Sequence, residues 1–338
     1  SLSASHFRYG TMSWDLTGND NATHTEIRLY VTTGWRTAYG NPFDTVGETA
    51  TTNNDGNNFI NINWGDGRTS SGVVIRTTSI DTAAGSSNAE IGTLSGDVWT
   101  PGLTHSYSDN GTHIVSWNDI YRITGIVNIA DSSKWRNETK VTIGGMHAGN
   151  VSPVSTMPPI IQVQDNTTDN FTFQVSATDA NSGDNLHYRW GTWQEFVDNE
   201  SSTYYPPTGM SLSSTGYIQW DVRDSALADN APVNSSAVSN SGIADAMWLA
   251  FIMVEDNGSS GDNKSHIPLD FFFKITAASN DPASLSGIPQ EPQIVSFGNT
   301  KTFTIISTDD SGVAPTITVL NPPSDNSSIW DNTPSASG

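Results

Sequence analysis

The 338-residue sequence contains no cysteine. This absence excludes disulfide bonds, thiolate metal sites, cysteine nucleophiles and iron–sulfur clusters. Basic residues are also scarce: 14 Lys and Arg stand against 35 Asp and Glu, which gives a formal net charge of −21. Such a chain repels nucleic-acid phosphates, so we expect no nucleic-acid partner. An acidic chain rich in small polar residues is typical of secreted surfaces and predicts an extracellular location.

Long apolar runs are missing as well. The longest candidate, AMWLAFIMV at 246–254, has the length of a buried strand and falls well short of the roughly 20 residues of a transmembrane helix. We therefore expect no membrane span in this segment. Helical periodicity is almost absent too, because DSALADN and SGIADAMW suffice only for a turn or two of helix.

The sequence does contain many short runs in which apolar and polar residues alternate, separated by Gly, Asn and Asp. This pattern, with its many β-branched residues, predicts short strands joined by turns. We expect an all-β fold of tandem immunoglobulin-like β-sandwich domains. Typical runs are HFRYGTMSW, EIRLYVTT, THIVSW, FTFQVSAT, GYIQWDV, LDFFFKI and KTFTIIST.

Two proline-rich stretches, at 149–160 and 279–293, predict linkers, because proline suits extended segments between domains. The domains expected are 1–152, a strand layer plus a sandwich; 153–280, a second sandwich; and 281–338, the start of a third. The third segment is shorter than the roughly 100 residues of a sandwich. We expect either that the chain continues beyond Gly338 or that another subunit completes this domain.

The first predicted sandwich resembles the PKD (polycystic-kidney-disease) domain over about residues 54–130. The resemblance lies in NFININWGDGRTSSG followed by GLTHSYSDNGTHIVSWND. It implies a tight structural turn in which Gly65 and Gly67 adopt φ > 0, Asp66 bonds the turn amides and Trp64 anchors the core. The first fifty residues lie outside the resemblance, and we expect them to add an extra strand layer.

The second predicted sandwich resembles cadherin-like and putative-Ig (dystroglycan-type) repeats of large secreted cell-surface proteins over about residues 158–280. FTFQVSATDANSGDNLHYRW and PPTGMSLSSTGYIQWDV carry the resemblance. KTFTIISTDDSGVAPTITVL repeats the same scheme in the third segment. A repeated domain predicts a tandem array, the usual plan of stalks and adhesins.

The cadherin-like resemblance implies Ca²⁺ bound at domain junctions by carboxylate and amide oxygens. Three departures weaken it: Asp179-Ala180-Asn181 replaces the family's paired Asp, and neither its early Glu nor its mid-domain Asp-Arg-Glu element has a counterpart. The alternative is that these residues form Asx turns with their own backbone. No other cofactor is expected. The candidate ligands are Asp179, Asn181, Asp184, Asp256, Asn280, Asp281 and Asp309.

Asn-x-Ser/Thr sequons occur along the whole chain and predict a glycoprotein. A further sequon at Asn150 is weakened by the nearby Pro153. The predicted glycosylation sites are Asn21, Asn110, Asn137, Asn166, Asn170, Asn199, Asn234, Asn257, Asn263 and Asn326.

Catalysis is not expected. Glu195, Asp198 and Glu200 lie near aromatics, as glycosidase carboxylates do, but such clusters arise freely in an acidic chain. The seven histidines lack zinc-site spacing. YRWGTWQEF and STYYPP could form an aromatic platform for sugars, although tryptophans that fill sandwich cores are the more common case.

These features favour a non-enzymatic extracellular structural protein, a subunit of a filament, surface layer or adhesin stalk. Its expected partners are copies of itself, and the strand at 6–14 is a candidate donor to the unpaired sheet edge of a neighbouring subunit. The alternatives are a carbohydrate-binding or cell-adhesion module, with glycans or a cell-surface protein as partner and Ca²⁺ as a cofactor, and an accessory region of a large secreted hydrolase.

Overall fold

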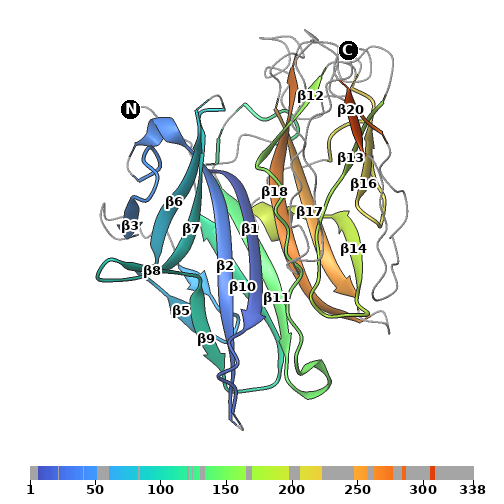
Figure 1. Ribbon diagram of the computed structural model, residues 1–338. Helices are drawn as coiled ribbons and strands as arrows, with labels where there is room; N and C mark the ends of the chain where they lie inside the picture. Colours follow the sequence, from blue (N-terminus) through green and yellow to red (C-terminus); the bar gives the residue numbers. More distant parts are fainter. Residues whose placement is uncertain are drawn as a thin grey trace. The chain divides into compact units, whose positions relative to one another are not determined.

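The computed structural model confirms the all-β expectation. It describes residues 7–21, 23–40, 42–51, 61–82, 84–119, 122–123, 125–129, 134–164, 170–197, 206–222, 247–257, 262–276, 284–286 and 305–308. The chain forms two compact units, Ser1–Thr276 (the main unit) and Ala277–Gly338 (Figure 1). Strands joined by turns dominate the described residues of the main unit, as the alternating sequence pattern predicts.

Most strands of the main unit belong to one 15-stranded sheet with the central order β3-β6-β7-β2-β1-β18-β11-β10-β4-β5. Its members are β1 (Phe7–Leu16), β2 (Thr25–Arg36), β3 (Thr49–Thr51), β4 (Ile62–Asn63), β5 (Thr69–Ser70), β6 (Val74–Asp81), β7 (Ser86–Ser95), β8 (Val98–Pro101), β9 (Leu103–Tyr107), β10 (Gly111–Asp119), β11 (Trp135–Ile143), β12 (Ile160–Gln164), β14 (Asn185–Trp190), β17 (Met247–Asn257) and β18 (Asn263–Thr276).

A second sheet of the main unit contains three strands, and the described helices are short. The three strands are β13 (Phe171–Gln174), β16 (Tyr217–Trp220) and β15 (Met210–Leu212), and the helical turns are η1 (Thr37–Tyr39), η2 (Gly145–His147) and α1 (Trp193–Val197). No helix among the described residues has both the length and the hydropathy to cross a bilayer. In the second unit, β19 (Ser284–Ser286) pairs with β20 (Ile306–Thr308).

The long strand β18 connects the sheet across the predicted boundary at residue 152. It pairs antiparallel with β1, β11 and β17, and parallel with β12. Strands from both sides of residue 152 therefore share one sheet, and this residue falls inside the main unit. The predicted boundary near 280 falls close to the division after Thr276. That the two sandwiches fold independently stays a prediction.

Two large apolar cores fill the main unit. One contains Trp14, Trp117 and Trp135, and the other contains Trp220 and Trp248. A smaller third core lies against the opposite face of β17, which is buried along most of its length. The described part of the run AMWLAFIMV, residues 247–254, is thus a buried strand, as its length predicts, and these tryptophans fill cores.

The N-terminal strand β1 does not form the outer layer expected from the sequence. It lies between β2 and β18, with Phe7, Met12 and Trp14 buried. Its second edge pairs with β18 at Gly10 and Thr11, so this edge is already used within the chain. The expected donation of this strand to a neighbouring subunit is therefore corrected: β1 completes the sheet of its own chain.

A fully buried ion pair joins β18 to the segment after β10. Arg122 Nη2 donates to Asp270 Oδ2 at 2.6 Å, and Nη1 donates to Oδ1 at 2.9 Å. Neither side chain is exposed. The Arg122 guanidinium carbon also lies 5.1 Å from the Phe7 ring centre and 5.2 Å from that of Phe251. Two parallel charge-assisted bonds offset the cost of burying both charges.

Breaking this pair from one side should destabilise the main unit. Asp270→Asn keeps the side-chain shape but leaves the Arg122 charge buried without a counterion, so we expect a loss of about 3–5 kcal/mol, measured by urea unfolding. Glu138→Gln in the partly exposed Arg136–Glu138 pair is the control, with an expected cost below about 1 kcal/mol. Equal costs for the two variants would contradict the prediction.

Candidate functional site

Three of the predicted calcium ligands form an acidic cluster, defined here as Asp179, Asp184 and Asp256. Each offers one carboxylate oxygen, and these oxygens lie within 4.8 Å of one another. Asp179 and Asp184 lie in the turn before β14, and Asp256 lies near the end of β17. The two elements meet because β14 pairs antiparallel with β17, with Leu186 opposite Asp256.

A lysine that the sequence analysis did not single out belongs to the same site. Lys264 Nζ forms an ion pair with Asp184 Oδ2 and lies 3.7 Å from Asp256 Oδ2. The β17–β18 hairpin places it there, since Asp256 lies opposite Ser265. Ser265 Oγ also donates to Asp256 Oδ2 at 3.2 Å. The chain therefore supplies one positive charge to three carboxylates.

The cluster shifts the protonation of its members. Burial, with the neighbouring Asp179 charge, raises the pKa of Asp256 from 3.8 to about 6, and Lys264 opposes the rise. Burial also raises the pKa of Asp179. For Lys264, burial lowers the pKa, but the bond to Asp184 and the nearby carboxylates outweigh it and leave the pKa raised. Like charges held close in a poorly solvated site produce these shifts.

The donor set fits a cation only in part. Asp179 Oδ2 and Asp256 Oδ1 are buried and, among the described residues, have no hydrogen-bond partner. Ca²⁺ needs six to eight oxygen ligands, however, and Lys264 already contacts the cluster. A divalent ion would have to displace the ammonium group and complete its shell with water. Binding of Ca²⁺ stays a prediction.

The other predicted ligands do not join the cluster in the described structure. Asn181 bonds backbone instead: its Oδ1 accepts from Val151 N, its Nδ2 donates to Gly149 O, and its own amide donates to Asp179 Oδ1 at 2.7 Å. This is the Asx-turn alternative considered above. Asn280, Asp281 and Asp309 lie outside the described residues.

The predicted structural turn at 64–67 joins β4 to β5. Gly65 and Gly67 have φ of 77° and 86°, a region that favours glycine. Asp66 Oδ1 accepts from Arg68 N at 3.0 Å, and its Oδ2 lies 2.9 Å from His105 Nε2. Trp64 is buried with its ring stacked on that of His105 at 4.4 Å. These contacts make the turn a packing element.

The predicted sequons differ in accessibility. Asn137 is 1% exposed inside the sheet, so its side chain is inaccessible in the folded chain, and glycosylation of the sequons stays a prediction. Asn21, Asn110 and Asn170 are exposed. Asn257 and Asn263 are partly buried, whereas Asn166, Asn199, Asn234 and Asn326 lie outside the described residues.

Glu195, a glycosidase candidate, forms an ion pair. Arg189 Nη2 donates to Glu195 Oε1 at 2.7 Å, and Nη1 donates to Oε2 at 3.0 Å. Burial raises the pKa of Glu195, but the bonds from Arg189 and Thr192 outweigh it and leave the pKa lowered. A carboxylate held ionised in this way suits a structural role. Asp198 and Glu200 lie outside the described residues.

Comparison with known proteins finds a family likeness in the first half of the chain. Residues 8–144, which run from β1 to the turn after β11, match the family model described as integrin beta-like protein A-E, N-terminal. The chain thus resembles the integrin beta-like proteins. Three of these proteins from Dictyostelium discoideum match about two thirds of the chain: protein B is 30% identical over 226 residues, protein A 28% over 229, and protein C 26% over 238.

The chain spans about a tenth of the length of each of these relatives, and 63–65% of the chain is aligned. The segment that carries the PKD-like signatures lies within the matched region, whereas the acidic cluster lies outside the family-model match. The resemblance to PKD and cadherin-like repeats stays a prediction.

The raised pKa of Asp256 predicts a pH-dependent stability. Because the folded chain holds this proton more tightly than the unfolded chain, the stabilisation is complete below about pH 4 and is lost as the pH rises through about 6. Asp256→Asn should therefore gain stability relative to wild type over this interval, by about 3 kcal/mol at most. Urea unfolding at a series of pH values measures the difference. Asp97→Asn, in an exposed turn, is the control. If the difference in unfolding free energy between Asp256→Asn and wild type does not change with pH, Asp256 is not the group responsible.

Removing Lys264 should expose the cation preference of the acidic cluster. Lys264→Met leaves three carboxylates without the ammonium group, so we expect a lower melting temperature in EGTA and a partial recovery when Ca²⁺ is added. Wild type should respond less, because Lys264 competes with the ion. Lys274→Met, near the other end of β18, serves as the control. Equal responses of wild type and Lys264→Met to Ca²⁺ would remove the cluster as a calcium site.

Proposed function

We propose that this chain is a non-enzymatic, extracellular β-sandwich region of an adhesion-type surface protein. The observation that carries the proposal is the match of residues 8–144 to the N-terminal region of the integrin beta-like family. That match covers the strands β1, β2, β7, β10 and β11, which build one of the two large cores. The likeness to integrin beta-like proteins favours an adhesion-related role at the cell surface.

The chemistry of the chain supports the same proposal. A net charge of −21 and the lack of cysteine suit a secreted surface whose stability rests on packed cores. Two described carboxylates form ion pairs with arginines and have a structural role: Asp270 binds Arg122, and Glu195 binds Arg189. The acidic cluster near Lys264 is our proposed site for Ca²⁺, which would act as a structural ion for the β13–β14 turn.

We further propose that the chain assembles into a filament, surface layer or stalk. The second unit, with the hairpin of β19 and β20, fits a chain built of successive β units. Because β1 already pairs with both β2 and β18, strand addition between copies would use other strands. Six strands of the 15-stranded sheet pair with one neighbour only among the described strands and so offer an edge for such a contact: β3, β5, β8, β9, β12 and β14.

An adhesion assay with coated beads tests the proposal. Beads carrying the folded chain should be retained on cells, and soluble chain should compete with the beads for binding. Beads carrying the Asp270→Asn variant should no longer be retained under conditions that partly unfold this variant. Clustering of the beads with one another would support self-assembly, and retention on cells without clustering would support a separate cell-surface partner. If both retention and clustering stay at the level of albumin-coated beads, the adhesion role is rejected.

A further inference from the structure

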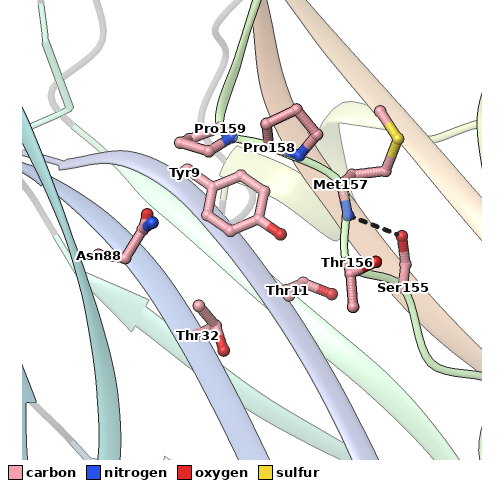
Figure 2. A pocket seen from close by; sticks show the side chains of 9 residues that line it. All are labelled: Tyr9, Thr11, Thr32, Asn88, Ser155, Thr156, Met157, Pro158 and Pro159. Atoms are coloured by element: carbon pink, nitrogen blue, oxygen red, sulfur yellow. Dashed lines mark hydrogen bonds between the residues drawn. The ribbon is translucent and has the colours of Figure 1, made fainter. Parts of the chain in front are cut away.

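A groove of about 410 Å³ lies in the main unit between the face of β1, β2 and β7 and the segment that leads into β12 (Figure 2). Its volume falls in the range of small-molecule sites. None of its lining side chains carries a formal charge, although the chain as a whole is strongly acidic. We call it the hydroxyl groove; it is lined by Tyr9, Thr11, Thr32, Asn88, Ser155, Thr156, Met157, Pro158 and Pro159.

Both walls of the groove are fixed. Thr11 and Thr32 lie directly opposite each other in the pairing of β1 with β2. On the other wall, Ser155 Oγ donates to Ser176 O at 2.7 Å, and Phe272 N donates to Pro159 O at 3.0 Å. A groove whose walls are held by the strands and by such bonds exists before a ligand arrives, which lowers the ordering cost of binding.

A glycine creates the room for this arrangement. A Cβ at Gly34 would lie 2.9 Å from Tyr9 Cβ and 3.5 Å from Pro159 Cβ. The absent side chain lets the Tyr9 ring and the proline segment approach β2 together. Any larger residue there would push one of the two walls outward.

Hydroxyl groups distinguish this groove chemically. The side-chain hydroxyls of Tyr9, Thr11, Thr32 and Thr156 form no hydrogen bond within the part of the chain that the structure describes. In Figure 2 the Tyr9 hydroxyl points toward Thr11 and the 155–157 segment. Burial and the Asp270 charge raise the pKa of Tyr9, so its hydroxyl keeps its proton. Each hydroxyl can therefore both donate and accept.

We propose that the hydroxyl groove binds an uncharged saccharide of about one to two rings. Sugar hydroxyls need the mixed donors and acceptors that these side chains offer, and Pro158 and Pro159 supply apolar surface for the C–H faces of a ring. Acidic sugars find no positive charge here. This inference rests on the proposed adhesion function and gives it a ligand class.

A peptide strand fits the groove less well. Strand addition requires a continuous row of backbone donors and acceptors. Pro158 and Pro159 have no amide N–H, and Pro159 O already accepts from Phe272 N. The 155–159 wall therefore lacks the donors that would hold an added strand, while its side chains remain open to a small polar ligand.

A glycan array with neutral, sialylated and sulfated oligosaccharides tests the proposal on the folded chain. We expect retention of neutral sugars and none of the acidic ones. Calorimetry with the best neutral sugar then compares variants. Thr11→Val and Thr32→Val remove a hydroxyl at nearly constant shape and should each weaken binding about three- to tenfold. Thr156→Trp should fill the groove and abolish binding.

Thr104→Val, at an exposed position of β9, is the matched control and should bind as wild type. The proposal for this groove is overturned if the chain binds no neutral sugar. It is also overturned if a neutral sugar binds Thr32→Val and Thr156→Trp with the same affinity. The bead assay is independent of both results: retention on cells that persists in Thr156→Trp would leave the adhesion role standing with its ligand site elsewhere. Circular dichroism of each variant checks that it is folded.

Discussion

The buried ion pair between Arg122 and Asp270 fixes how the parts of the main unit meet. Asp270 lies on β18 opposite Gly10 of β1, and Arg122 comes from the segment after β10. Because both charges are fully buried, any arrangement in which they do not bond each other would leave a buried charge unpaired and would be strongly destabilised. The rings of Phe7 and Phe251, which flank the guanidinium group, belong to two different cores. The pair therefore ties the segment after β10 to β18 at the residue of β18 that pairs with β1.

Both candidate sites are built on strands that pair with β18. On one side of β18, β1 carries Tyr9 and Thr11 to the hydroxyl groove. On the other side, the β17–β18 hairpin brings Lys264 against the carboxylates of Asp184 and Asp256. Small residues permit the close approach, because a side-chain carbon at Gly10 would overlap Asn137. A shift of one residue in the pairing of β1 with β18 would move Tyr9 and Thr11 to the opposite face of the sheet.

Local features of this fold could be predicted from the sequence, whereas long-range ones could not. Alternation and turn residues identified most strands, and the glycines at 65 and 67 identified the turn before β5, since both signals are local. Three of the proposed calcium ligands do come together, because Asp179 and Asp184 share a turn that pairs beside Asp256. Lys264 was missed, since its approach to Asp184 depends on the register of a hairpin.

The place of the N-terminal strand was misjudged for a related reason. An amphipathic strand at the start of a chain carries no signal of which neighbours it will pair with, so β1 was expected in an extra strand layer and lies instead between β2 and β18. Arg122 gave no signal either, because its partner Asp270 is distant in the sequence and a lone arginine is usually exposed. Pairing across such distances is decided by packing and buried charge.

The few basic residues offset part of the negative charge inside so acidic a chain. Arg122, Arg189 and Lys264 each lie against buried or half-buried carboxylates. With 14 bases for 35 acids, many carboxylates have no basic counterpart, and solvent and salt screen the repulsion between those that face water. An uncharged groove set in such a surface repels anions at long range but still presents hydroxyl groups at contact. The charge distribution that suits the chain to an extracellular surface therefore also favours a neutral ligand in the hydroxyl groove.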